Sequence, residues 1–288
     1  MNQPFAETAL LIQGPYQKNI TEEIFAKNKN DFNEIVFSTW ASDQRIRIPG
    51  VKIIKSPIPE TNNIHNSQNI YFQTCSMING LKNISSKFVI KTRSDEYFSN
   101  LKFLAKKGCM TNKMIISNIF IKEVSYKKFH ISDHLFFADK VTLLETFNLL
   151  KVFLEKKEDE LNLNIKRDEM PAEVKIALFY LNSKGYKLKD LINCSEKKAF
   201  EIMKSEFQVY DIEYLKPYMI SASSIGKIKC LKKFCRFDGI HGLNYFKSIH
   251  DLAPRNKYQI FLKRIINAFK KRIFNRFFRF FFEENKNY

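Results

Sequence analysis

The chain has 288 residues, of which 44% are hydrophobic and 27% are charged, and it contains only 8 Gly and 8 Pro. This length suits one large domain, or one domain with a small appendage, and the composition excludes a disordered, collagen-like or turn-rich all-β chain. With 48 Lys and Arg against 30 Asp and Glu, the net charge of +18 indicates a polyanionic partner such as nucleic acid, an anionic bilayer or a phosphate-bearing substrate.

Short apolar runs that predict strands alternate with helical segments through the first half of the chain. Strands are expected at 8–13, 34–39, 51–55, 87–92, 113–121 and 134–138. Helices are expected from Thr21, as the N-cap, and over 66–81 and 100–107, with Gly80 and Gly108 near the ends of the last two. This alternation predicts an α/β fold with a mostly parallel sheet covered by helices on both faces.

The second half of the chain is predicted to be mainly helical. Helices are expected over 140–154 and over Pro171–Leu181, where Pro171 takes the first helical position. The charged stretch 155–168 between them is expected to be exposed, residues 186–254 are expected to be mixed, and a long helix is expected over 255–282.

The cysteines and the N-terminal residues bear on the cellular compartment. The five cysteines form no C-x-x-C pair, which predicts reduced thiols in a cytosolic protein. The first residues have no basic region before their short apolar run, and no apolar stretch of about 18 residues occurs. We therefore expect neither a signal peptide nor a membrane-spanning helix.

Polar residues end three of the predicted strands, where parallel sheets bind their ligands. They are Gln13-Gly14-Pro15, Ser38-Thr39-Trp40 and Arg93-Ser94-Asp95-Glu96. Gly14 permits close approach of the backbone to a base or ribose, and Trp40 can stack on a base or sugar. A simple strand-ending turn and ordinary packing explain the same two residues equally well.

The strongest local signal is the segment 88–98, FVIKTRSDEYF, in which a buried strand runs directly into charged residues. Carboxylates at this position can hold a divalent ion that binds a diphosphate, and Arg93 can offset the negative charge of that diphosphate. A helix, an apolar strand and an Asp-bearing turn follow one another as in nucleotide-sugar transferases of the GT-A type. The motif here is R-S-D rather than D-x-D, so one acid is missing. The alternative is a solvated, charged turn.

The whole first half of the chain resembles the WavE lipopolysaccharide-synthesis proteins, glycosyltransferases of bacterial surface polysaccharides. Six segments carry the resemblance in order over about residues 9–180: Ala9–Pro15, Ile35–Trp40, Asn69 to Leu81, Lys91–Asp95, Ile131–Asp139 and Pro171–Glu173. The family carries Arg-Gln where this chain has Phe72-Gln73. An arginine that would contact the base or a phosphate is therefore expected to be missing here.

The resemblance implies a GT-A-like, Rossmann-like sheet with a helical C-terminal part, and a nucleotide-sugar as donor. The donor would be bound by Gln13, Gly14, Pro15, Thr39, Trp40, Asn69, Gln73, Arg93 and Asp95. A divalent ion, Mn²⁺ or Mg²⁺, would be held by Asp95 and by His241, because GT-A enzymes often take a late histidine as a metal ligand. A structural role for His241 remains open.

Two carboxylates are candidates for the catalytic base. Asp133 is the expected base, which takes the proton of the acceptor hydroxyl, although it also fits an N-cap or an ordinary loop acid. Glu173 follows Pro171 in a first helical turn, where an acid favours the helix dipole. The resemblance keeps Glu173 as an acceptor-binding residue or base, whereas His134 is expected to be structural.

The C-terminal segment 255–288 needs its own explanation, because it holds 10 Lys and Arg against 2 Glu. Its apolar residues recur on one helical face: Phe261, Leu262, Ile265, Ile266, Phe269, Ile273, Phe277 and Phe280. This pattern predicts an interfacial amphipathic helix on an anionic membrane surface. The alternative is a C-terminal helix that packs on the core.

We expect a glycosyltransferase that moves a sugar from a nucleotide-sugar to a lipopolysaccharide, lipooligosaccharide or capsule acceptor, which would be lipid-linked. The predicted organisation is a donor-binding and catalytic region at 1–190, a mixed part of the same domain at 191–254, and the basic helix at 255–288. The protein is expected in the cytoplasm, at the inner face of the cytoplasmic membrane. A basic, non-catalytic nucleic-acid-binding protein is the alternative, but no recognition motif supports it, so no nucleic acid is expected as partner.

Overall fold

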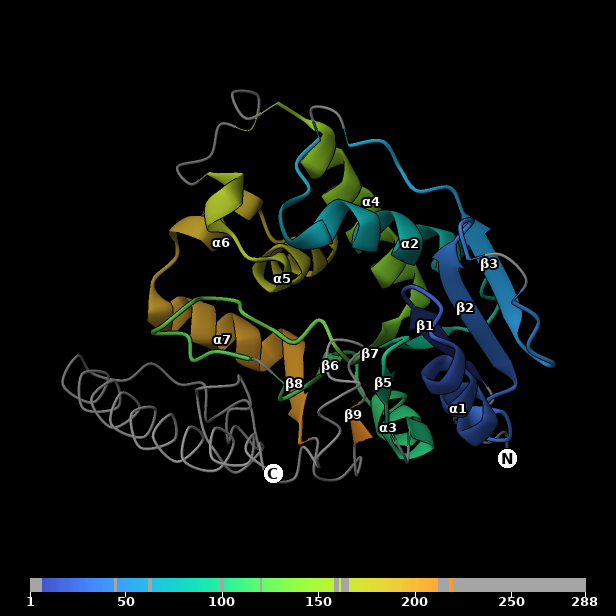
Figure 1. Cartoon of the computed structure of the whole chain (residues 1–288). Helices are drawn as coiled ribbons and strands as arrows, with labels where there is room; N and C mark the ends of the chain where they lie inside the picture. The colour runs from blue at the N-terminus through green and yellow to red at the C-terminus, as the bar shows by residue number, and fades with distance from the viewer. Residues whose placement is uncertain are drawn as a thin grey trace, which may run out of the picture.

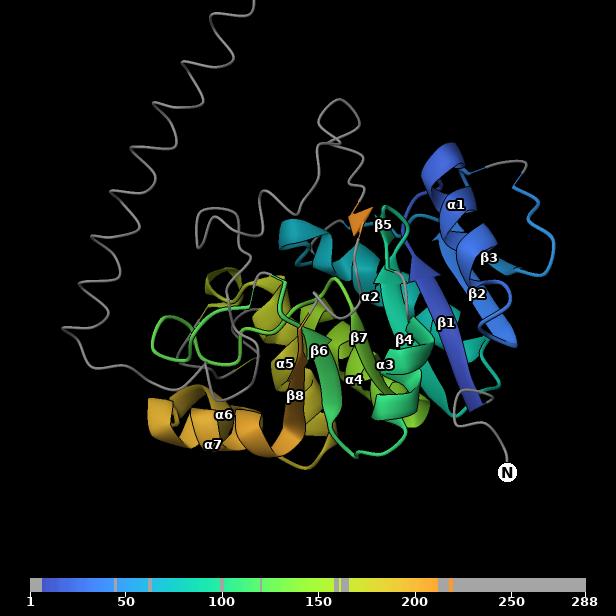
Figure 2. The same cartoon turned by 90° about the horizontal axis from the view of Figure 1, so that it is seen from below.

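The computed structural model describes residues 7–43, 46–61, 64–98, 101–119, 121–157, 161, 166–211 and 218–219. These residues build a mixed sheet that lies between two layers of helices (Figure 1). Its strand order is β3-β2-β1-β4-β7-β6-β8, and Figure 2 shows the sheet from below. The strands are β1 (Thr8–Gln13), β2 (Glu34–Trp40), β3 (Lys52–Ser56), β4 (Phe88–Arg93), β6 (Met114–Ser117), β7 (Phe136–Asp139) and β8 (Phe207–Tyr210).

Most neighbouring strands of this sheet run parallel. β1 pairs in parallel with β2 and β4, β2 with β3, and β6 with β8, whereas β7 is antiparallel to β4 and β6. In this register Gln13 lies opposite both Ser38 and Arg93. The polar residues that end β1, β2 and β4 therefore lie side by side at one edge of the sheet. The predicted α/β fold with a mostly parallel sheet is confirmed.

Helices cover both faces of the sheet (Figure 1). One face carries α2 (Ile70–Lys82), α4 (Lys140–Glu155) and α5 (Ala172–Ser183), and the other carries α1 (Lys18–Asn28) and α3 (Leu101–Gly108). The helices α6 (Leu188–Asn193) and α7 (Glu196–Glu206) follow α5 and lead into β8. Short 3-10 turns at Ser67–Asn69 and Arg167–Glu169 precede α2 and α5, and β5 (Glu96–Tyr97) pairs with β9 (Tyr218–Met219) outside the main sheet.

The central strand β1 is buried along its whole length, because helices cover it from both sides. The helix α2 approaches this strand closely at Gly80, where a Cβ would lie only 2.6 Å from Leu11 Cδ1. A glycine is therefore needed at this contact. The opposite end of α2 carries Phe72 and Gln73 to the edge where the strands end.

Several element boundaries differ from the sequence prediction. The first helix begins at Lys18 rather than at Thr21, because the Thr21 hydroxyl makes other contacts: it accepts the Gln17 N–H at 3.0 Å and donates to the Ser94 carbonyl at 3.2 Å. The strand expected at 113–121 is confined to Met114–Ser117, and Pro171 is the N-cap of α5 rather than its first residue.

The described residues of the charged stretch 155–168 are mainly exposed, as expected, and Arg167 is the exception. Arg167 is buried, and its Nη1 donates to the carbonyls of Phe153 at 3.2 Å and Leu154 at 3.1 Å. These carbonyls belong to the last turn of α4, where helices leave backbone acceptors unpaired. The prediction of an exposed segment was therefore wrong at this arginine alone among the described residues.

Residues 220–288 lie outside the described part of the chain, and with them His241 and the expected basic helix at 255–288. Among the helices that are described, none has the length and the apolar character needed to cross a membrane. The expected division at residues 190 and 254 stays a prediction, although β8 joins residues 207–210 to the main sheet through β6.

Candidate functional site

A cavity of about 500 Å³ lies at the carboxyl ends of β1, β2 and β4, against the N-terminal end of α2. Nine of the residues singled out in the sequence line it: Gln13, Gly14, Pro15, Trp40, Asn69, Gln73, Arg93, Asp95 and Asp133. The other lining residues are Gln17, Gln68, Phe72, Ser76, Lys91 and Ser94. Residues from 13 to 133 in the chain thus meet at one place, where sheets of this kind bind ligands.

The turns that follow β1 and β4 are joined into one unit beneath the cavity. The Ser94 N–H donates to the Gln13 carbonyl at 2.9 Å, and the Ser94 hydroxyl donates to the Pro15 carbonyl at 2.8 Å. Gly14 has a φ of +134°, and a Cβ on it would lie 2.5 Å from Ser94 Oγ. Both the backbone angle and the space therefore require glycine at this position.

One wall of the cavity is aromatic. The rings of Trp40 and Phe72 meet edge to face, with their centroids 5.9 Å apart. Phe72 stands where the resemblance led us to expect an arginine, so this wall is apolar rather than cationic. Thr39 does not line the cavity: its hydroxyl donates to Asp43, which also accepts the Tyr16 N–H at 2.8 Å and so joins the two turns.

A charged group of residues forms the other end of the cavity. Arg93 binds both carboxylate oxygens of Asp95, with Nε at 2.9 Å and Nη2 at 3.0 Å, and its Nε lies 3.3 Å from Glu96. The side chains of Asp95 and Glu96 are 12% and 2% exposed, whereas that of Arg93 is 40% exposed. Burial lowers the pKa of Arg93, but the hydrogen bond to Asp95 and the nearby carboxylates outweigh it and raise this pKa above its usual value.

Lys91 is a cavity residue that the sequence analysis missed. Its side chain is completely buried, its Nζ donates to the backbone carbonyl of Asp133, and the ammonium lies 5.4 Å from the centre of the Phe136 ring. Burial lowers the pKa of Lys91 to about 8, although Asp133 counteracts part of this effect. In the sequence, the feature that could have identified Lys91 is its position as a lysine in the middle of an apolar strand.

Asp133 takes part in a chain of polar contacts. The Gln13 amide donates to the Gln73 carbonyl at 2.6 Å, and the Gln73 amide donates to Asp133 Oδ2 at 3.3 Å. His134 lies between two carboxylates, with Nε2 3.7 Å from Asp133 and Nδ1 in contact with Glu96. His134 thus contributes to the charged group beside the cavity.

The charges around Asp133 set its proton affinity and that of His134. Burial alone would raise the pKa of Asp133, but His134, Lys91 and Arg93 together lower it. Burial alone would lower the pKa of His134, but Glu96 and Asp133 raise it. Asp133 therefore favours the ionised form and His134 the protonated form. The N-cap alternative for Asp133 does not hold at α4, because Asp139 caps that helix by accepting the Thr142 N–H at 3.0 Å.

Glu173 does not line the cavity, but it lies close enough to Asp133 for their charges to interact. Burial first and Asp133 second raise the pKa of Glu173. Its Oε2 is buried without a hydrogen-bond partner in the part of the chain that the structure describes. This carboxylate therefore holds a proton more readily than Asp133 does.

Two residues at the N-terminal end of α2 adopt an unusual backbone conformation. Gln68 and Asn69 have φ angles of 57° and 58°, in the left-handed region that few non-glycine residues enter. Both are exposed and both line the cavity. The Gln68 side chain accepts the Ala172 N–H at 2.9 Å, and so connects the cavity wall to the first turn of α5, beside Glu173.

The described residues do not fit a divalent metal ion. Among them, no group of three or more His, Cys, Asp or Glu side chains is arranged to hold one. Asp95, the metal ligand expected from the sequence, accepts hydrogen bonds from Arg93 with both carboxylate oxygens. A fixed cation beside a carboxylate opposes the binding of a second cation. The other expected ligand, His241, lies outside the described residues.

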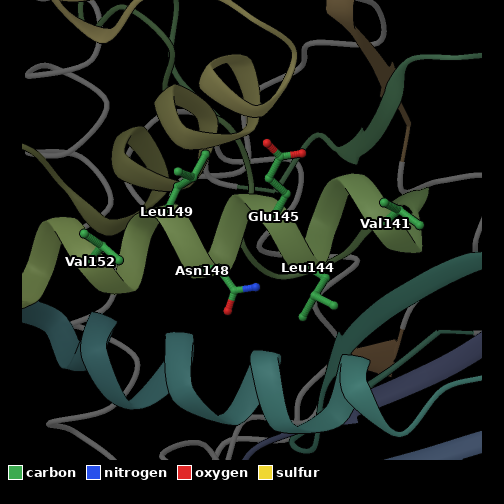
Figure 3. Close-up of a pocket in the computed structure, with 6 residues that line it drawn as sticks. All are labelled: Val141, Leu144, Glu145, Asn148, Leu149 and Val152. Atoms are coloured by element: carbon green, nitrogen blue, oxygen red, sulfur yellow. The ribbon is translucent and has the colours of Figure 1, made fainter.

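A second cavity, of about 350 Å³, lies along α4 (Figure 3). Its lining residues all come from this one helix: Val141, Leu144, Glu145, Asn148, Leu149 and Val152. Because it brings together no charged or polar residues from different elements, it offers no chemistry comparable to that of the first cavity.

One comparison with known proteins concerns the structure and two concern the sequence. Two crystal structures of HddC from Yersinia pseudotuberculosis, one of them complexed with GMP-PN, are similar to part of this chain. The complex has a TM-score of 0.30 and 10% identity over 48% of this chain and 79% of HddC; the other structure gives 0.31 and 12% over 48% and 78%. Similarity at this level carries no information about function. No curated protein matches the sequence significantly.

The sequence comparison is decisive for the family. The family model for WavE lipopolysaccharide synthesis matches residues 8–189, which is well over half of the chain. The matched region contains every described residue of the cavity. The resemblance seen in the sequence is thereby confirmed, and the chain belongs to the WavE lipopolysaccharide synthesis family.

Proposed function

We propose that the protein is a glycosyltransferase that moves a sugar from a nucleotide-sugar donor to a lipopolysaccharide, lipooligosaccharide or capsule acceptor. Membership of the family supports a role in lipopolysaccharide synthesis. The observation that carries the proposal further is the cavity at the strand ends, which combines an aromatic wall with a charged end where the Arg93 guanidinium is partly exposed. A nucleoside diphosphate needs both, because its base is planar and apolar on its faces whereas its phosphates are anionic.

The residues suggest one orientation of the donor in this cavity. The base packs against Trp40 and Phe72, close to the turn at Gly14, where the backbone can approach it. The diphosphate lies at Arg93, the most exposed member of the charged group. The sugar then extends toward Asp133, which lines the same cavity.

In the proposed reaction, the oxygen of an acceptor hydroxyl forms a bond to the anomeric carbon of the sugar. The bond between that carbon and the diphosphate oxygen breaks, its electron pair leaves with the nucleoside diphosphate, and the hydroxyl proton passes to a carboxylate. Arg93 offsets the charge that develops on the leaving diphosphate. Asp95 holds the Arg93 guanidinium in place through the two hydrogen bonds between them.

Of the two candidate bases, Glu173 has the surroundings that favour this proton transfer, although it lies near Asp133 outside the cavity lining. A base with a raised pKa takes up a proton more readily, and the pKa of Glu173 is raised whereas that of Asp133 is lowered. Asp133 accepts a hydrogen bond from Gln73, while Glu173 Oε2 has no partner in the described structure. Asp133 then serves to organise Gln73 and His134 beside the sugar.

The acceptor is proposed to be lipid-linked, and the segment 255–288 is proposed to bring the protein to the inner face of the cytoplasmic membrane. Both parts of this proposal rest on the sequence: the family acts in lipopolysaccharide synthesis, and the segment combines Phe with an excess of Lys and Arg.

The proposed function is tested by adding a panel of nucleotide-sugars to the full-length protein and measuring its melting temperature and the release of nucleoside diphosphate. At least one donor should raise the melting temperature and be slowly hydrolysed or transferred. Wild-type protein that responds to no nucleotide but is stabilised by duplex DNA would instead support a nucleic-acid-binding protein.

A further inference from the structure

Besides Arg93, a second cation, Lys91, lines the cavity. Lys91 and Arg93 are two residues apart on β4, so their side chains leave the same face of the sheet. Both line the cavity. Along the strand their Cα atoms are separated by roughly 6–7 Å, the rise of two residues. Two cations thus face one cavity from a single rigid strand.

The two cations differ in how completely the protein has neutralised them. Arg93 is paired with Asp95 through two hydrogen bonds and lies within ion-pair distance of Glu96. Nζ of Lys91 donates to a neutral backbone carbonyl, that of Asp133, and no carboxylate lies within ion-pair distance of it among the described residues. An ammonium has three donors, so two of them remain for a ligand.

Burying a cation whose hydrogen-bond donors are unused costs free energy unless an anion offsets its charge. The depressed pKa of Lys91 has this origin, because burial disfavours the charged form. An anion that entered the cavity would recover the lost interaction at the Lys91 ammonium, which is buried from water. The diphosphate of a nucleotide-sugar has the required charge and several acceptor oxygens.

We propose that Lys91 and Arg93 together bind the diphosphate of the donor and offset the charge of the leaving nucleoside diphosphate, so that no divalent ion is required. This inference rests on the proposed function, because it names the residues that hold the donor. Asp95 is then a positioning residue for Arg93 rather than a metal ligand. The poor fit of the described residues to a divalent ion agrees with this division of roles.

The alternative is that Lys91 has only a structural role, in which it holds the segment at Asp133 through the backbone carbonyl. The two roles differ in what they predict for ligands. A structural lysine would affect the binding of a nucleoside and of a nucleoside diphosphate alike. A lysine that binds the diphosphate would affect the nucleoside diphosphate alone.

The experiment measures, by titration calorimetry on the full-length protein, the dissociation constants of nucleoside diphosphates and of the matching nucleosides. Both ligands are tested with EDTA and with added Mn²⁺. The wild-type protein should bind one nucleoside diphosphate with EDTA within about twofold of its affinity with Mn²⁺. The substitution Lys91→Met should weaken that binding by roughly tenfold or more and leave nucleoside binding within about twofold.

Lys128→Met is the matched control, because the Lys128 ammonium also donates to backbone carbonyls, those of Ile192 and Cys194 at 2.7 Å each, but does not line the cavity. It should leave both ligands bound as in the wild type. If Lys91→Met does not fold, the inference is tested by Arg93→Gln and by the EDTA measurement on the wild type. The Arg93 side chain is 40% exposed, so its loss should disturb the fold less than the loss of Lys91.

Results against the inference can be told apart from a result against the proposed function. Unchanged diphosphate binding in folded Lys91→Met, or diphosphate binding that disappears with EDTA, overturns the inference and leaves the proposed glycosyltransferase intact. Unchanged diphosphate binding in Arg93→Gln also overturns it. A wild-type protein that binds no nucleotide at all, with or without Mn²⁺, contradicts the proposed function itself.

Discussion

At the scale of single residues, two carboxylates that look equivalent in sequence are separated by their environments. Asp133 is surrounded by His134, Lys91 and Arg93, which lower its pKa, whereas burial and the charge of Asp133 raise the pKa of Glu173. A group with a raised pKa suits proton uptake near neutral pH, and a group with a lowered pKa suits a fixed negative charge.

Substitution of these two carboxylates should separate their roles. We expect Glu173→Gln to lower kcat by roughly 10²-fold or more, the usual effect of losing a general base, and to leave donor binding nearly unchanged. We expect Asp133→Asn to raise KM for the donor more than it lowers kcat. Steady-state kinetics over a range of pH measure both effects.

The pH profile adds an independent check on Glu173. Because its pKa is raised, the wild-type rate should fall on acidification at a pH above the usual range for a glutamate, as the base becomes protonated. Glu173→Gln should lose this acidic limb. If the limb persists in Glu173→Gln and disappears in Asp133→Asn, then Asp133 is the base.

Lys91 gives the binding of the donor a dependence on alkaline pH. Its pKa is lowered to about 8 by burial; Asp133, Glu96 and Asp95 favour the charged form, and Arg93 opposes it. As pH rises from 7 to 9 the ammonium is lost, so the dissociation constant of the nucleoside diphosphate should increase, by up to roughly tenfold. Lys91→Met should show a shallower dependence. An equally steep dependence in that variant would mean that another group titrates.

At the scale of elements, the turn before α2 connects the cavity to α5. Gln68 and Asn69 both have left-handed backbones, which cost a non-glycine residue about 1–2 kcal/mol each, with less for asparagine. They differ in one contact: Gln68 accepts the Ala172 N–H at 2.9 Å, whereas Asn69 makes no side-chain capping bond to α2. Variants of these two residues can therefore separate the effect of the hydrogen bond on stability from the effect of the backbone strain.

We expect Asn69→Gly to raise the free energy of unfolding by about 0.5–1 kcal/mol, because glycine adopts this backbone angle without strain. Gln68→Gly should gain somewhat more relief, because this backbone angle strains glutamine more than asparagine, but it also loses the hydrogen bond to Ala172, which contributes about 1 kcal/mol. It should therefore be no more stable than Asn69→Gly. Urea unfolding measures the difference, and a Gln68→Gly protein that is clearly the more stable of the two would show that the contact to α5 contributes little.

The elements that the sequence predicts well are those set by local patterns. The apolar runs that end in polar residues identify β1, β2 and β4, and the register brings those ends together as expected. The start of α1 was placed one turn too late: the helix begins at Lys18, and the Thr21 hydroxyl donates to the Ser94 carbonyl, 73 residues away, instead of capping the helix as its first residue. No local pattern reports such a contact.

The residues of the candidate site were also predicted where local patterns identify them and missed where their role depends on distant contacts. The sequence identifies nine of the lining residues, because they end strands or lie in segments that resemble the family. Lys91 was missed because it was taken for the interior of a strand, and its contact is the Asp133 carbonyl, 42 residues away. The edge-to-face packing of Phe72 on Trp40 was missed because it depends on how α2 lies against β2.

At the scale of the whole molecule, the charge of +18 is divided between the segment 255–288, which contributes +8, and the remainder of the chain, which contributes +10. The prediction for the segment comes from its sequence. Removal of residues 260–288 should release the protein from anionic vesicles, because each Lys or Arg near such a surface contributes about 1 kcal/mol. The cavity should still bind nucleotide. Vesicle flotation with full-length and shortened protein measures this.

Salt provides the control for the membrane prediction. High salt should weaken the attachment of the full-length protein without abolishing it, because salt does not screen the apolar contribution of Phe. A full-length protein that ignores anionic vesicles, together with a shortened protein that unfolds, would show that the segment packs on the core.

The central claim is that the cavity at the ends of β1, β2 and β4 binds a nucleotide-sugar, and the fluorescence of Trp40 tests it most directly. Trp40 is the single tryptophan of the chain and lines this cavity, so its emission reports on that place alone. Titration with nucleotide-sugars should give a saturable change in Trp40 emission for at least one donor, and duplex DNA should give none. An emission that stays constant for every nucleotide-sugar, in a protein that remains folded, would contradict the account.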